Sequence, residues 1–141
     1  MRLAMAKCRM NLMILWLSGS LVFLLIIWLQ VALGHYGSNG REAFEWFIPV
    51  VTPTLSLVVG VWAQSAIKTQ KESVLIGKRV YSIAVIVSGV YFGFILLTIL
   101  IEPFVAKAPI DFLKESSLVF GILQGVVTAV MGIFFSQKEQ E

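Results

Sequence analysis

Residues 21–29 read LVFLLIIWL, an unbroken apolar run that decides the fold class of the chain. The charge-free interval around this run extends from residue 10 to residue 34. A hydrocarbon core about 30 Å thick needs about 20 helical residues, because each residue adds about 1.5 Å. Peptide groups in hydrocarbon must bond within their own segment or a closed barrel, and this run lacks the polar-apolar alternation of a barrel strand. The interval therefore predicts a membrane-spanning helix.

Three more charge-free intervals, at 46–67, 80–101 and 116–137, have the length of a membrane span. The composition agrees, because 58% of the residues are hydrophobic and only 13% are charged, against about 25% charged in soluble domains. We predict an all-α polytopic membrane protein, with four transmembrane helices bundled into one domain over residues 1–141. The first span exceeds the roughly 7–15-residue apolar region of a signal peptide, so we expect it to be retained.

The basic residues predict how the chain is oriented. Eight of the 11 lysines and arginines lie before the first span, between the second and third spans, or after the fourth span. The positive-inside rule then predicts a multi-pass protein of the inner (plasma) membrane with both termini in the cytoplasm. The middle loop should form a patch that contacts acidic lipid head groups or a cytoplasmic protein partner. This patch consists of Lys68, Lys71, Lys78 and Arg79.

The second span combines prolines with a polar stripe. Pro49 and Pro53 should form a hinge that kinks the helix near its outer third, because proline removes a backbone donor. A set of small or polar residues recurs every fourth position: Thr52, Ser56, Gly60 and Gln64. One interpretation is a pore lining, and the other is a tight helix interface whose hydroxyls bond their own backbone. The interface is the commoner use of such stripes, and an oligomer can combine the two.

The third and fourth spans carry small residues at intervals of four. The third contains Gly89 and Gly93, a spacing that lets helix backbones approach closely. The fourth carries a longer ladder, made of Ser117, Gly121, Gly125 and Ala129. Nearby, Gln124 and Thr128 are candidates for hydrogen bonds across helices. We expect these faces to pack against other helices, either within one chain or between chains.

The spans contain no Asp, Glu, Lys, Arg or His. Ionisable side chains inside a membrane usually mark proton relays, so their absence argues against a proton-coupled exporter but not against a pore. Glu102 is expected at a solvated helix end, with a charged mouth as the alternative. His35 is expected in an interfacial loop, with a proton sensor as the alternative. Cys8 is the only cysteine and cannot form an internal disulfide or a cysteine metal cage.

The layout resembles that of the small four-span exclusion and defence proteins of bacteria and their phages (RexB-like). The similar features are the basic middle loop, from Lys68 to Arg79 and on into Val80, and the short charged end from Gln137 to Glu141. The resemblance implies an oligomeric membrane protein that depolarises the cell or supports a partner that responds to phage. It transfers no functional residue to this chain.

These observations favour a non-enzymatic protein, since no catalytic constellation, phosphate loop or set of metal ligands is present in the sequence. We expect a homo-oligomeric ion channel, pore or membrane-perturbing effector in antiviral defence. One alternative is a membrane anchor or scaffold that recruits a cytoplasmic protein. Another is a facilitator for a small neutral solute. No cofactor and no direct contact with nucleic acid are expected.

Overall fold

The computed structural model describes residues 2–67 and 75–136 of the chain. It is built from four long helices: α1 (Met5–Ala32), α2 (Gly40–Ile67), α3 (Lys78–Ile101) and α4 (Pro109–Ser136). All four are long and apolar enough to cross a membrane, as the charge-free intervals predict. Each helix begins before its predicted span, and α4 has Pro109 in its first turn, where a missing N–H costs nothing. The architecture is consistent with a multi-pass membrane protein.

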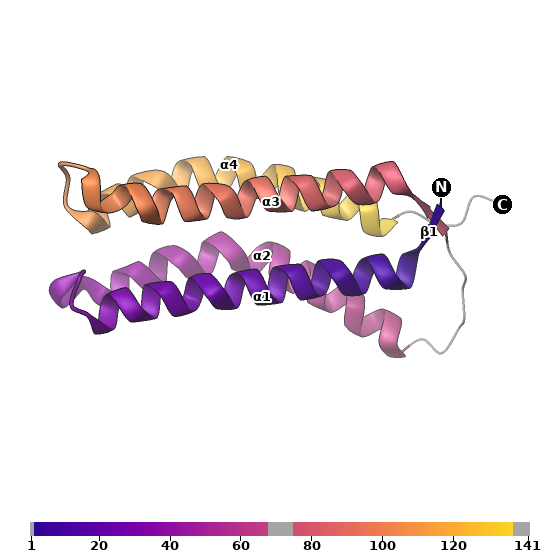
Figure 1. Cartoon of the computed structure of the whole chain (residues 1–141), viewed down its shortest axis with the longest axis horizontal. Helices are drawn as coiled ribbons and strands as arrows, with labels where there is room; N and C mark the ends of the chain where they lie inside the picture. Colours follow the sequence, from indigo (N-terminus) through magenta and orange to yellow (C-terminus); the bar gives the residue numbers. More distant parts are fainter. Residues whose placement is uncertain (1, 68–74, 137–141) are drawn as a thin grey trace.

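The helices form two antiparallel hairpins that lie side by side (Figure 1). One hairpin is α1–α2 and the other is α3–α4, and α2 packs on α4 while α1 packs on α3. Short 3-10 helices, η1 (Gly37–Asn39) and η2 (Glu102–Phe104), lie in the connections at one end, which we call the distal end. Long helices of this kind satisfy most of their backbone groups without water, apart from those at the termini and at the internal prolines of α2.

A two-stranded antiparallel ribbon ties the hairpins together at the opposite end, which we call the ribbon end. Strand β1 (Arg2–Ala4) pairs with β2 (Leu75–Gly77), with Leu3 opposite Ile76. Each strand runs directly into a helix, β1 into α1 and β2 into α3. The ribbon was not predicted, because three-residue strands from distant parts of the sequence leave no periodic pattern.

The core lies between the hairpins and is filled by large side chains. On α1 the buried positions follow a helical spacing through Cys8, Leu12 and Trp16. Trp16, Tyr91 and Phe134 are almost completely buried. Trp16 stacks on Tyr91 with ring centroids 5.8 Å apart, and its Nε1 donates to Ser88 Oγ at 3.0 Å. The interior of one chain is therefore packed rather than hollow between α1 and α3.

Candidate functional site between α2, α3 and α4

Helix α2 runs through both of its prolines without a break. Pro49 and Pro53 lie inside the helix, and in Figure 1 the helix changes direction near its middle. Proline at position 53 cannot donate to the carbonyl of residue 49, so the ladder of backbone hydrogen bonds is interrupted there. A bent α2 agrees with the predicted hinge, although the bend lies closer to the middle than to the outer third.

A polar cluster joins α2 to α3 and α4 at this part of the helix. Tyr91 Oη of α3 donates to the Val50 carbonyl at 2.6 Å. With its amide oriented to match donors with acceptors, Gln124 Nε2 donates to Tyr91 Oη at 2.6 Å and to the Val50 carbonyl at 2.9 Å. Gln124 Oε1 then accepts from the Oγ1 of Thr54 at 2.6 Å and from its backbone N–H at 3.0 Å. Thr128 Oγ1 lies 3.4 Å from Thr54 Oγ1.

We call these five residues, Val50, Thr54, Tyr91, Gln124 and Thr128, the bend cluster. Thr54 and Tyr91 are fully buried, and Gln124 is half-buried. A polar atom in a hydrocarbon environment is costly without a partner, and here every donor has an acceptor. The Gln124 amide therefore bonds both the carbonyl of Val50 and the backbone N–H of Thr54, the acceptor and the donor of one helical turn of α2. The cluster therefore joins three helices where α2 bends, and it does so without any charged group.

A groove between α2 and α4 leads to the bend cluster from the outside of the bundle. Its volume is about 310 Å³. Val50 and Gln124 of the bend cluster line it together with Pro49 and Gly121. The remaining lining residues are Glu45, Trp46, Ser117 and Phe120. Chemically, the groove combines an apolar wall with the Gln124 amide, the Ser117 hydroxyl and the Glu45 carboxylate, a lining that suits hydrogen bonding to a small molecule. No group of three metal-ligating side chains occurs among the residues that the structure describes.

The predicted polar stripe on α2 faces away from the bundle. Its four residues, Thr52, Ser56, Gly60 and Gln64, are all exposed. Thr52 Oγ1 donates to the Ile48 carbonyl at 2.7 Å, so this hydroxyl bonds its own backbone. The buried hydroxyl on α2 is that of Thr54, which lies off the predicted stripe. The signal that pointed to it was the pair Gln124 and Thr128 on α4, expected to bond across helices.

The small-residue faces of α3 and α4 also point outward from the single chain. Gly89, Gly93, Gly121 and Gly125 are exposed, and a methyl group added at any of them would meet nothing within 4 Å. The other ladder members, Ser117 and Ala129, are exposed too. Ser117 and Gly121 line the groove beside α2, but these faces are not covered by another helix within the described part of the chain, so contact between copies stays a prediction. Of the basic patch, Lys78 and Arg79 are exposed at the start of α3, while Lys68 and Lys71 lie outside the described residues.

The close approach between the hairpins occurs at a different glycine, Gly19. A Cβ at this position would lie 2.8 Å from the Phe92 ring, which is itself held against Trp16 with centroids 4.7 Å apart. We expect Gly19→Ala to lower the free energy of unfolding by about 1 kcal/mol relative to Gly89→Ala. Both substitutions raise helix propensity equally, but only the first meets a packed ring. Unfolding in mixed detergent micelles measures the difference, and equal stability of the two variants would contradict the close approach.

The distal end holds a second group of polar residues. His35 Nε2 lies 2.8 Å from Glu102 Oε2, and only 2% of Glu102 is exposed. The expectation that Glu102 is a solvated helix end is wrong, because η2 turns its side chain inward towards the α1–α2 connection. Neighbouring Tyr36 donates to Gln30 Oε1 at 3.0 Å. Burial, with a contribution from the negative charge of Glu102, raises the pKa of the Tyr36 phenol to about 12.

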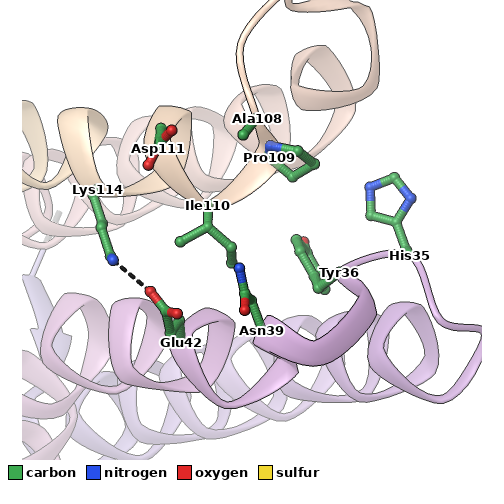
Figure 2. Close-up of a pocket in the computed structure, with 9 residues that line it drawn as sticks. All are labelled: His35, Tyr36, Asn39, Glu42, Ala108, Pro109, Ile110, Asp111 and Lys114. Atoms are coloured by element: carbon green, nitrogen blue, oxygen red, sulfur yellow. Dashed lines mark hydrogen bonds and ion pairs between the residues drawn. The ribbon is translucent and has the colours of Figure 1, made fainter.

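A cavity of about 340 Å³ adjoins this group, between the α1–α2 connection and the start of α4. Figure 2 shows His35 at one side of the cavity and the ion pair between Lys114 and Glu42 at the other. Tyr36 and Asn39 lie between them. The ion pair joins α2 to α4, so both hairpins are tied at the distal end by charged contacts.

The two groups differ in chemistry. The bend cluster is neutral and internal, whereas the distal group is charged and partly open to solvent. Neither presents a nucleophile beside a base, so geometry gives no support for catalysis among the described residues. Compared with known protein families, with curated proteins and with solved structures, the chain gives no match.

Proposed function

We propose that the protein is a non-enzymatic, homo-oligomeric membrane protein whose assembly forms an ion-conducting pore. The observation that carries the proposal is the outward position of the polar stripe on α2. Polar residues that face lipid gain nothing, whereas the same residues around a water-filled path between copies stay solvated. The packed interior between α1 and α3 supports a path formed between copies rather than within one chain.

The faces of α4 and α3 supply the proposed contact between copies. Gly121 and Gly125, about one helical turn apart, leave the α4 backbone open, and helices in lipid associate through such small-residue faces. The bend in α2, held from inside by Gln124, would set the angle at which the polar stripe meets the path. By the positive-inside rule, we place the ribbon end in the cytoplasm and the distal end outside the inner membrane.

The test measures association and ion flux together. The full chain is purified, its mass in detergent is determined by sedimentation, and potassium flux is followed in liposomes. We expect an oligomer that conducts, and we expect the double variant Gly121→Leu with Gly125→Leu to lose both association and flux. Because these glycines have open space around them, the variant should keep the helical content of the wild type.

Val126→Leu is the matched control for this test, since Val126 is an exposed residue of the same helix off the small-residue ladder. It should associate and conduct as the wild type does. A monomeric wild type, or liposomes that stay tight with an associated protein, would rule out the pore. Gln64→Leu gives a finer check, because a residue that lines the path should alter conductance without altering association.

A scaffold function is the second candidate, and the ribbon favours it. β2 runs directly into Lys78 and Arg79, so the ribbon fixes two members of the basic patch beside the chain's N-terminal strand. A cytoplasmic partner could be held there while the helices serve as the anchor. Co-purification of a soluble partner that is lost in Lys78→Gln with Arg79→Gln would support this function. The RexB-like resemblance adds the proposal that either activity operates in antiviral defence.

A further inference from the structure

The distal end contains a buried acid, Glu102, whose hydrogen-bonding neighbour among the described residues is His35. Glu102 begins η2, directly after α3, and His35 lies in the connection between α1 and α2. The 2.8 Å contact between them therefore joins one hairpin to the other. The Glu102 side chain is 1% exposed and the His35 side chain is 32% exposed, so solvent reaches the base but not the acid.

The other carboxyl oxygen of Glu102 lacks even such a contact. Oε1 is buried and has no hydrogen-bond partner within the described residues. A buried carboxylate that lacks a counter-charge is strongly disfavoured, and removing one member of a buried pair is the most damaging change to it. Among the described residues, His35 is the side chain that lies within hydrogen-bonding distance of this carboxyl group.

Several other titratable groups lie near the pair, and in the α3–α4 connection Lys107 is paired with Glu115. Tyr36 lies beside both residues, and with a pKa raised to about 12 its phenol stays neutral well above neutral pH. Across the cavity, Glu42 is paired with Lys114, and Asp111 lines the wall. Figure 2 shows these α2 and α4 side chains on the far side of the cavity from His35. A change in the charge of His35 therefore acts mainly on Glu102.

We propose that His35 and Glu102 form a proton-operated latch that closes the distal end by holding the two hairpins together. Histidine is the side chain that ordinarily changes charge between pH 5 and 8. A protonated His35 gives an ion pair and a closed latch. Loss of that proton at higher pH leaves the buried carboxylate without a cation, so the latch loosens. The inference is independent of whether the protein conducts ions.

The distance between the two connections tests the latch. Spin labels are attached at Ser38→Cys and Ala106→Cys, both exposed positions, in a Cys8→Ala background and with the full chain in lipid nanodiscs. Pulsed electron spin resonance then gives the distance distribution at pH 5.5 and at pH 8.5. We expect a narrow distribution at pH 5.5 and a broader or longer one at pH 8.5.

Three variants separate the effect of the imidazole from that of the other groups. His35→Lys carries a charge at both pH values and should keep the narrow distribution at both. His35→Gln removes the switching charge, and Glu102→Gln removes the acid that this charge acts on, so each should give the same distribution at both pH values. An unchanged distribution in the labelled wild type, or the same pH response in His35→Gln, would overturn the proposal. Circular dichroism confirms that each variant keeps its helical content.

Discussion

Trp16→Ala will lower the free energy of unfolding by about 3–5 kcal/mol, the range for removing a large buried aromatic side chain. Trp16 has no exposed surface. Its ring contacts Tyr91 and Phe92 across the boundary between the hairpins. The substitution removes these contacts, leaves a cavity, and deprives Ser88 Oγ of its indole donor at 3.0 Å.

Trp28→Ala is the matched control, because Trp28 lies on the same helix with 59% of its surface exposed. It should change the free energy of unfolding by less than about 0.5 kcal/mol, as surface substitutions do. Both variants are unfolded in mixed micelles with increasing denaturing detergent and followed by circular dichroism. A Trp16→Ala protein as stable as Trp28→Ala would show that the two hairpins do not depend on this contact.

The number and the approximate positions of the long helices could be predicted because hydrocarbon imposes strict rules on length and charge. The faces of the helices could not. In a water-soluble protein, polar residues mark the exposed face of a helix. Lipid is as apolar as a protein core, so the buried face and the lipid-facing face of a membrane helix have similar residues in the sequence. Thr52 and Thr54 illustrate the problem. They differ by two positions, yet Thr52 is exposed and Thr54 is buried.

Contacts between residues that are distant in the sequence could not be predicted either. The pairing of His35 with Glu102 needs η2 to turn the acid inward and the α1–α2 connection to meet it, and neither local segment contains that information. The same holds for Gly19, where the partner ring comes from α3. The glycine ladders of α3 and α4 were visible from spacing alone, but spacing does not say whether the same chain or a second copy covers them.

Gln124→Leu should lower the free energy of unfolding by about 1–3 kcal/mol, the cost of leaving buried polar groups without partners. The leucine fills a similar volume but removes the amide that bonds Thr54, Tyr91 and the Val50 carbonyl. Hydrogen bonds between membrane helices are individually modest, at about 0.6 kcal/mol on average. Gln124 makes four contacts within the bend cluster, so the loss should be measurable.

The control for this substitution is Gln64→Leu, which makes the same change at an exposed position of α2. It should leave the stability of the four-helix unit unchanged or slightly higher, because lipid favours leucine. The double variant Gln124→Leu with Thr54→Val should be less destabilised than the sum of its single variants, since each removes the other's partner. Additive effects would show that Gln124 and Thr54 act separately. A Gln124→Leu protein as stable as wild type would mean that the prolines alone, without the amide, hold α2 in its bent form.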